Sequence, residues 1–588
     1  MPDDSGSGLS RRQVLAVSGT GLLAATTARP ARAAGRGRPD PGDGTPEQIH
    51  LTWGEDPARS IVVSWASPGQ AVRPRVRIGQ RVIKAEERVY TDGLNGQVTW
   101  TYHARVLGLR PGATYGYAVT ADNDVNGTDP FSATFTTAPE GRAGFRFTSF
   151  GDLATPNTDW VLSYGQAAYA VGAVESFQPL FHLLNGDLCY AGLNPAAQPE
   201  VWRDFGNNNQ ASAAYRPWMP VPGNHEIEFC NGPQGFTSYL TRYTLPHNGI
   251  PGFEGRWYSF RVGSVLFVSL SADDVVYQDA GAFVAGPAAL TPAASTGNPP
   301  VPAGTSLYVR GYSGGAQTQW LEATLAAARR DASIDWIIAQ MHQCACSSSR
   351  EGNGSDLGIR EEWLPLFDRY EVDLVLCGHD HDYERSFPVR GFDAGAGAES
   401  AAGAPAGTRR PHPVTTVDSG VFDTSQGTVH LILGCGGTDA NLDAYGAAGA
   451  AAEAGEATAK VFTRPNRPAP TGTAGVYARA GADALEDATW SARRDTATGY
   501  GIAVFDVHPG GEEGGQTSIT VTHYHAVGAD PVNPATGERG APTDDYTLFE
   551  TFTLVRPRSD GRRWHAKQSA AVTVPAGESQ PPVPENGL

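Results

Sequence analysis

Short runs of alternating apolar and polar residues fill the chain from about residue 44 to residue 138. Six such runs are IHLTWG, SIVVSWAS, RVRIGQ, WTYHARVLGL, TYGYAVTA and FSATFTTAP, with turn residues between them. Alternation with a period of two is typical of strands that bury one face. The pattern predicts a small β-sandwich over residues 44–138, with His103 as an exposed strand residue.

From about residue 143 the pattern changes, and apolar strands alternate with helical segments. The runs GFRFTSFGD, FHLLNGD, MPVPGNHE, VLFVSLSAD, WIIAQMHQ and VDLVLCGHDH each end in polar residues. Helical periodicity is present in WLEATLAAARRD and IREEWLPLFDRYE, and closing strands follow in YGIAVFDV, TSITVTHYHAV and YTLFETFTLV. This order predicts an α/β domain over residues 143–556, in which a site forms outside the carboxyl ends of the strands.

Two stretches interrupt this domain, at about 392–427 and 438–497, and both are rich in Ala and Gly. We interpret them as surface insertions, with GTVHLILGCGG between them as a further buried strand. Residues 558–588 lack periodicity and are expected to form a disordered, solvated tail.

The first 33 residues have the order of an export signal. Arg11 and Arg12 precede a modestly apolar stretch, and the small-residue site Ala31-Arg32-Ala33 follows it. That order is typical of a bacterial twin-arginine signal. We expect residues 1–33 to be removed and the protein to be secreted or associated with the cell wall.

Six cysteines in an exported chain could form disulfides. Cys189 with Cys230 and Cys377 with Cys435 are plausible bridges, whereas Cys344 and Cys346 either pair with each other or stay free. The sequence does not decide among these pairings.

Length and charge limit the possible partners. A chain of 588 residues is expected to form two or three domains. The formal charge of −18 argues against nucleic acid or an anionic membrane as the main partner, because both require a positive surface. No segment offers about 20 uninterrupted apolar residues, so no membrane span is predicted. The oligomeric state is left open.

Residues that can bind metal ions close five of the predicted strands. Because the carboxyl ends of such strands meet, we expect these donors to gather at one edge of one sheet. A chance cluster would leave several charges half-buried, at roughly several kcal/mol each, and a pair of cations about 3.5–4 Å apart would remove that cost. The expected donors are Asp152, Asp187, Tyr190, Asn224, His342, His379 and His381.

The order of these blocks resembles that of the metallophosphoesterases. The blocks are GDLA, GDLCY, GNHE, the histidine of WIIAQMH, and GHDH, and Tyr190 narrows the resemblance to the purple acid phosphatases. LRPGATYGYAV, ending near FTTAP, resembles part of a fibronectin type III-like module. The resemblance implies an α/β metallophosphoesterase sandwich of two mixed β-sheets flanked by helices, preceded by a small all-β fibronectin type III-like domain.

The resemblance also implies which residues would bind each metal ion. Asp152, Tyr190 and His381 would hold a ferric ion, and Asp187 would bridge to a second ion. A phenolate ligand favours ferric iron and gives the family its colour.

Asn224, His342 and His379 would complete the second site, for divalent iron, zinc or manganese. In the same resemblance, His225 contacts the substrate phosphate and helps the leaving alkoxide to depart. The implied reaction is in-line attack of a metal-bound hydroxide on phosphorus.

The sequence departs from the family pattern in three places, one of which comprises two cysteines. Ala154 stands where the family usually has Gly, and Cys344 and Cys346 stand where a Pro and an aromatic residue are frequent. Asn353 stands where many relatives place another histidine near the substrate. Substrate preference is therefore the least determined property.

The implied function is that of a secreted dinuclear-metal acid phosphatase that hydrolyses small phosphate monoesters. An alternative is a phosphodiesterase with the same metal centre, acting on nucleotides, cell-wall polymers or phospholipid head groups. A third reading is a binding protein built on a decayed enzyme. The presence of all seven expected ligands and of His225 argues against that reading.

Overall fold

The computed structural model describes residues 42–561, apart from several internal gaps. The gaps are 128, 229, 233, 279–309, 351, 394–407, 439–457, 464–468, 471–476, 479–481, 497 and 528–544. The expected export signal (1–33), most of the expected tail (562–588) and much of the two Ala/Gly-rich stretches lie outside the described residues.

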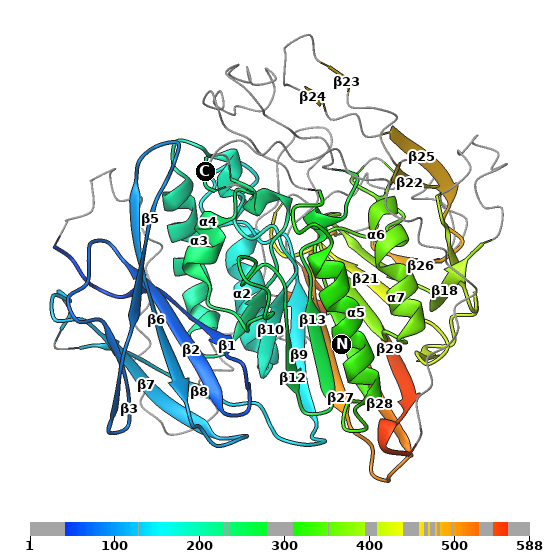
Figure 1. The fold of residues 1–588 in the computed structure, drawn as a ribbon, viewed down its shortest axis with the longest axis horizontal. Helices are drawn as coiled ribbons and strands as arrows, with labels where there is room; N and C mark the ends of the chain where they lie inside the picture. Colours follow the sequence, from blue (N-terminus) through cyan, green and yellow to red (C-terminus); the bar gives the residue numbers. More distant parts are fainter. Residues whose placement is uncertain are drawn as a thin grey trace, which may run out of the picture. The chain divides into compact units, whose positions relative to one another are not determined.

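The N-terminal part consists of two four-stranded antiparallel sheets that share one apolar core (Figure 1). The first sheet has the order β1 (Glu47–Trp53), β2 (Ser60–Ser67), β6 (Val98–Leu107), β5 (Glu86–Thr91), and the second β4 (Arg81–Lys84), β3 (Arg75–Ile78), β7 (Thr114–Thr120), β8 (Phe131–Thr136). The predicted all-β domain is confirmed. Strands β4 and β5 were not predicted, because most of their side chains are exposed and apolar positions do not alternate regularly in them.

The prediction that His103 is exposed was wrong. Its ring is buried, with Nδ1 2.8 Å from Ser64 Oγ and Nε2 2.9 Å from the backbone oxygen of Thr241. Thr241 belongs to helix α4 (Thr237–Arg242), which covers this part of the sandwich. The alternating pattern identified the strand correctly but could not show that its second face is also covered.

Two seven-stranded mixed sheets form the rest of the core. The first has the order β11 (Trp218–Pro220), β10 (Phe181–Leu184), β9 (Phe145–Phe150), β27 (Gly501–His508), β28 (Gln516–Val527), β29 (Asp545–Pro557), β20 (Val421–Asp423). The second has the order β12 (Tyr258–Val262), β13 (Val265–Ser269), β14 (Trp336–Gln340), β16 (Leu374–Cys377), β21 (Val429–Leu433), β17 (Tyr383–Ser386), β26 (Ser491–Arg494). The predicted sandwich of two mixed sheets is confirmed.

Aromatic rings join the two sheets. Phe147 on β9 stacks on Phe505 of β27 at 4.4 Å between ring centroids, and it meets Phe267 of β13 edge-on at 5.2 Å. Phe181 of β10 meets Phe267 edge-on at 5.2 Å as well. Edge-to-face contacts at these distances are favourable beyond the burial of apolar area, so they fix how the sheets face each other.

Helices flank the sheets. Helix α5 (Ala316–Arg330) places Leu321 and Leu325 in one core cluster with residues of β13, β14 and α7, and Figure 1 shows α5 and α7 in front of the second sheet. The predicted helix at IREEWLPLFDRYE is split at Trp363 into two pieces, because Pro365 lacks the N–H that would continue the first. The two pieces of the split helix are α6 (Leu357–Glu362) and α7 (Leu364–Arg369). The other helices of three or more turns are α2 (Gln166–Phe177) and α3 (Gln198–Ala213).

Parts of the Ala/Gly-rich stretches form strands. Strands β20 and β26 extend the two large sheets, and a third sheet consists of β15 (Ser355–Asp356), β22 (Thr458–Thr463) and β25 (Ala482–Asp487). The smaller pairs are β18 (Val389–Phe392) with β19 (Pro411–Pro413), and β23 (Ala469–Pro470) with β24 (Tyr477–Ala478); the short 3-10 helices are η1 (Ala191–Leu193), η2 (Asn224–Glu226), η3 (Ala272–Asp274) and η4 (Ser559–Gly561).

All six cysteines lie in the described part of the chain, and none of them forms a disulfide there. The bridges considered from the sequence, Cys189–Cys230 and Cys377–Cys435, are therefore not formed. Cys344 instead donates a hydrogen bond from Sγ to the backbone oxygen of Gly378, at 3.2 Å. Among the described helices, none combines the length and apolarity needed to cross a membrane.

A buried ion network fixes the C-terminal strand to the second sheet. The carboxylate of Asp373, just before β16, pairs with Arg556 of β29 and lies 2.7 Å from Nη2 of Arg329 on α5. Burial alone would raise the pKa of Asp373, but the two guanidinium groups outweigh burial and lower it. Removing one partner from such a network leaves uncompensated buried charge.

We predict that Asp373→Asn lowers the free energy of unfolding by about 3–5 kcal/mol, measured by urea denaturation. Asp506→Asn is the matched control, because Asp506 pairs with Arg146 where both side chains are 33% and 42% exposed. Such an exposed pair contributes about 1 kcal/mol or less. If both variants lost the same free energy of unfolding, the Asp373 network would not stabilise the fold more than an exposed ion pair does, which would contradict the prediction.

His430 on β21 is predicted to make stability fall in acid. Burial, and then the charge of Arg360, lower the pKa of His430 to about 3, and neither ring nitrogen has a hydrogen-bond partner among the described residues. An unfolded histidine titrates near 6.5, so below that pH the unfolded chain binds a proton that the folded chain does not, and stability is lost as the pH falls.

His430→Leu is therefore expected to lose about 2 kcal/mol less unfolding free energy than the wild type between pH 7.5 and pH 5. His508→Leu, at an exposed position of β27, is the control and should keep the wild-type pH dependence. Identical pH dependence in the His430 variant and the wild type would refute the account of this residue.

Candidate metal centre

The expected metal ligands follow strands of both large sheets. Asp152 follows β9, Asp187 and Tyr190 follow β10, and Asn224 follows β11, all in the first sheet; His342 follows β14, and His379 and His381 follow β16, in the second. The expectation that all belong to one sheet was wrong. The two sheets face each other, so their carboxyl ends supply donors from two sides.

Four of these residues have a backbone conformation that is uncommon outside glycine. Asp152, Asp187, Tyr190 and His379 have φ values of 57°, 48°, 60° and 73°. Strain of this kind costs of order 1–3 kcal/mol per residue and clusters at functional sites. Hydrogen bonds hold the turns in place: Asp152 N–H donates to the Gly186 oxygen (3.1 Å), and His379 N–H donates to Asp152 Oδ2 (2.9 Å).

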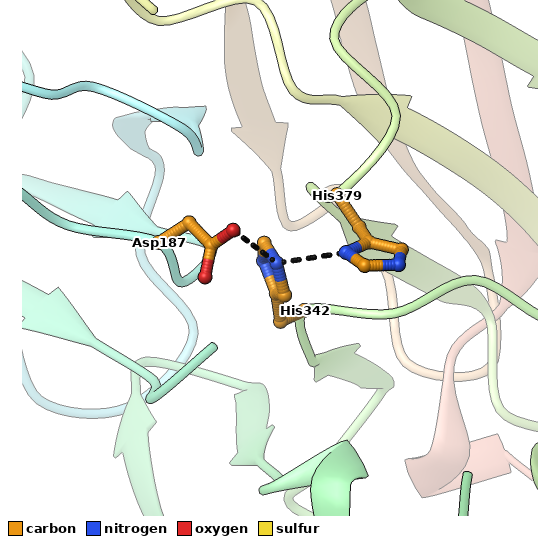
Figure 2. Close-up of side chains that lie close together, drawn as sticks. All are labelled: Asp187, His342 and His379. Carbon is orange, nitrogen blue, oxygen red and sulfur yellow. Dashed lines mark hydrogen bonds and ion pairs between the residues drawn. The ribbon is translucent and has the colours of Figure 1, made fainter. Parts of the chain in front are cut away.

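One cluster of donors converges on His342 (Figure 2). Its Nε2 lies 3.0 Å from Asp187 Oδ2, 3.1 Å from His379 Nδ1 and 3.2 Å from Asn224 Oδ1. The ligand atoms of Asp187, His342 and His379 all lie within 4.8 Å of one another. A single ring nitrogen cannot serve three such neighbours with one proton.

Hydrogen bonds on the far side of each ring indicate where the protons are. His342 Nδ1 lies 2.8 Å from the backbone oxygen of Asn185, which can only accept, so Nδ1 carries a proton and Nε2 is free to bind a cation. His379 Nε2 lies 2.6 Å from Gln278 Oε1, which likewise accepts and leaves Nδ1 for the site. Four electron pairs thus meet at one point, as in a metal site.

The titration behaviour of these residues shows the same need for positive charge. Burial alone would lower the pKa of His342, but the carboxylates of Asp187 and Asp152 raise it to about 10. Burial raises the pKa of Asp187, but His342 and His225 outweigh burial and lower it. Burial and the charge on His342 lower the pKa of His379 well below its usual range. A single proton on His342 stands in for a cation, so the donor set fits a metal ion.

A second cluster lies beside the first. Tyr190 Oη is 3.1 Å from Asp152 Oδ1 and 3.1 Å from His381 Nε2, and Asp152 Oδ1 is 3.4 Å from His381 Nε2. Burial, and then the charge of Asp152, raise the pKa of the Tyr190 phenol well above its usual range. Carboxylate, phenol and imidazole together form a second donor set that fits a metal ion.

His225 lies between the two clusters. Its ring centroid is 4.7 Å from that of Tyr190, its backbone N–H donates to Asp187 Oδ1 at 2.8 Å, and its side chain is 26% exposed. His381 is 18% exposed, whereas Asp187 and His342 are almost fully buried. The open side of the centre is therefore the side of His225 and His381.

Comparison with known proteins agrees with this geometry. Residues 46–138 match "Purple acid Phosphatase, N-terminal domain", and residues 145–383 match "Calcineurin-like phosphoesterase". The chain belongs to the purple acid phosphatases. It is a metal-dependent phosphoester hydrolase.

Relatives of this purple acid phosphatase occur in bacteria and plants. The chain is 40% identical over 596 residues to an uncharacterized protein of Mycobacterium tuberculosis, covering 95% of this chain and 98% of the relative. It is 25% identical over 365 residues to the Fe(3+)-Zn(2+) purple acid phosphatase 12 of Arabidopsis thaliana, covering 59% and 66%. The structure of purple acid phosphatase PPD1 from yellow lupin (Lupinus luteus) seeds, 18% identical, shares the fold with a TM-score of 0.54 over 88% of this chain and 75% of that one.

Several residues that support the ligands were not identified from the sequence. Glu226 accepts backbone N–H groups of Leu188 and Gly223, each at 2.8 Å, and so ties the loop after β10 to the loop after β11. It lies within the GNHE block, which could have suggested it. Gln278 carried no signal, because nothing in its neighbourhood resembles a motif.

Asn353, at one of the positions that depart from the family pattern, supports the loop that carries His379. Asn353 Nδ2 donates to the backbone oxygen of His379 at 2.7 Å, and its backbone N–H donates to Asp380 Oδ1 at 2.8 Å. Asp380 therefore supports the loop and is not part of either donor cluster.

Glycine is required where the backbone approaches the ligands. A Cβ on Gly378 would lie 2.4 Å from Asp152 Oδ2, and one on Gly223 would lie 2.3 Å from Asp187 Oδ1. A Cβ on Gly186, which also has a positive φ of 81°, would lie 2.6 Å from His342 Nδ1. The glycines of the sequence blocks thus leave room for the side chains of the proposed ligands.

Gly378→Ala is predicted to displace Asp152 and to lower the metal content per chain to half or less, measured by elemental analysis after gel filtration. Gly511→Ala, where no heavy atom lies within 4 Å of the added Cβ, is the control and should keep the wild-type content. Full metal content in the Gly378 variant would contradict the close-approach argument.

Proposed function

We propose that this purple acid phosphatase is a secreted acid phosphatase that hydrolyses small phosphate monoesters at a dinuclear metal centre. The observation that carries the proposal is the convergence of Asp187, Asn224, His342 and His379 on one point, beside the cluster of Asp152, Tyr190 and His381. Two ions bound there would polarise the phosphate and activate a water molecule for attack on phosphorus.

The chain's own residues have distinct proposed roles. Asn224 is a neutral ligand, so the centre keeps enough positive charge to attract a phosphate ester. His225 is on the open side, with Nε2 3.9 Å from Asp187 Oδ2. There it can hydrogen-bond to the phosphate and give a proton to the leaving alkoxide oxygen. The carboxylates of Asp152 and Asp187 each contribute to one of the two clusters, and both are shielded from water.

We propose Fe(III) for the cluster of Asp152, Tyr190 and His381, and divalent iron, zinc or manganese for the other. The buried phenol of Tyr190 has a raised pKa beside Asp152, so only a strongly charged cation would displace its proton in acid. The Arabidopsis relative, named an Fe(3+)-Zn(2+) purple acid phosphatase, supports the same pairing.

We propose export by the twin-arginine route, with release or retention at the cell wall. The twin-arginine pattern at Arg11 and Arg12 supports this proposal. None of the six cysteines forms a disulfide in the structure, and all but Cys230 are buried. That property suits a chain that folds, and acquires its metal ions, before it crosses the membrane.

The proposal is tested by turnover of p-nitrophenyl phosphate and bis-p-nitrophenyl phosphate from about pH 4 to pH 9 with metal-analysed protein. We expect faster hydrolysis of the monoester with an optimum on the acid side. Asp187→Asn should reduce turnover at least 100-fold, because it removes a charged ligand of the cluster. Asp506→Asn, far along the chain at an exposed ion pair, should keep wild-type turnover.

Preference for the diester would instead favour a phosphodiesterase with the same centre. A fully metallated sample that hydrolyses neither ester would contradict the proposed function.

A further inference from the structure

The side-chain amides of two residues form a closed ring of three hydrogen bonds with His379. His379 Nε2 lies 2.6 Å from Gln278 Oε1, Gln278 Nε2 lies 2.9 Å from Asn353 Oδ1, and Asn353 Nδ2 lies 2.7 Å from the backbone oxygen of His379. The ring thus begins and ends on the same residue, and it connects the imidazole of that residue to its own backbone through two amides.

The direction of each bond in this ring follows from one fixed point. The backbone oxygen of His379 can only accept, so the group of Asn353 facing it is the NH2 group. Oδ1 of Asn353 then faces Gln278, which must present its own NH2 group, and Oε1 of Gln278 is left facing His379. An amide oxygen can only accept, so Nε2 of His379 carries the proton and Nδ1 does not.

Both amides are anchored through their backbones. The N–H groups of Gln278 and Tyr277 donate to Oδ2 of Asp356, each at 2.8 Å, and the N–H of Asn353 donates to Asp380 Oδ1 at 2.8 Å. Asp356 also accepts from Gly358 N–H at 2.7 Å, at the start of α6. Gln278 itself is buried. These bonds fix the backbone positions from which the two amide side chains extend.

We propose that Gln278 and Asn353 are positioning residues for the second metal ion. They hold the proton of His379 on Nε2 and keep its Nδ1 directed at His342 and Asp187. The proposal rests on the proposed function, since it concerns the same metal centre. The two histidines differ in what fixes their tautomers. The tautomer of His342 is fixed by the backbone oxygen of Asn185, which no substitution removes.

The test measures the metal content per chain in buffers of increasing chelator concentration. Gln278→Met keeps the length of the side chain but removes the acceptor, and it is expected to weaken binding of one ion 10- to 100-fold while the other is retained. Asn353→Ala removes the fixed point, so Gln278 can turn over, and a smaller loss of the same ion is expected. Gln278→Glu restores an acceptor toward His379 and should recover most of the affinity.

The control is Gln317→Met. Gln317 is a buried amide that bonds to the backbone of Ser271 on both sides and touches no proposed ligand. The Gln317→Met substitution should lower the melting temperature about as much as Gln278→Met does. The Gln317→Met protein should still bind both ions with wild-type affinity.

Wild-type affinity for both ions in Gln278→Met would overturn the inference, and so would equal loss of both ions. Failure of the wild type to hydrolyse any phosphate ester would refute the proposed function but not this inference. Selective loss of one ion in Gln278→Met would support the inference in either case.

Discussion

The centre depends on one constraint: buried electron pairs that face one another need a positive charge between them. At His342, a carboxylate oxygen, an amide oxygen and a second imidazole nitrogen lie 3.0–3.2 Å from one ring nitrogen. A single proton can satisfy one of these contacts, and the raised pKa of His342, about 10, reflects how strongly the cluster holds it. A metal ion can satisfy all of them together.

The fold supplies this arrangement from two directions. Strands of two facing sheets end at the same place, and the rings of Phe147 and Phe267 fix how those sheets lie against each other. Four of the proposed ligands adopt strained left-handed conformations, and Gly223 and Gly378 allow the backbone to approach the proposed ligands closely. The free energy spent on this strain is offset by the packing between the sheets and by networks such as that of Asp373.

The fold class, and many of the strands that precede the proposed ligands, could be predicted because they leave local signals in the sequence. Runs such as VDLVLC are long and apolar, and the ligands stand directly after them. The structure brings the proposed ligands together in two clusters. Their roles in metal binding stay predictions. Long-range contacts left no local signal, so the burial of His103 against α4 and the position of Gln278 were missed. Strand β5 was missed because it is an exposed, charged edge strand.

The most direct test of the account is a crystal structure of the metal-loaded protein, with anomalous difference maps at the metal absorption edges. Two peaks about 3.5–4 Å apart are predicted. One should lie among Asp187, Asn224, His342 and His379, and the other beside Asp152, Tyr190 and His381. A single peak, or an empty cluster with a proton retained between Asp187 and His342 in protein that hydrolyses phosphate esters, would contradict it.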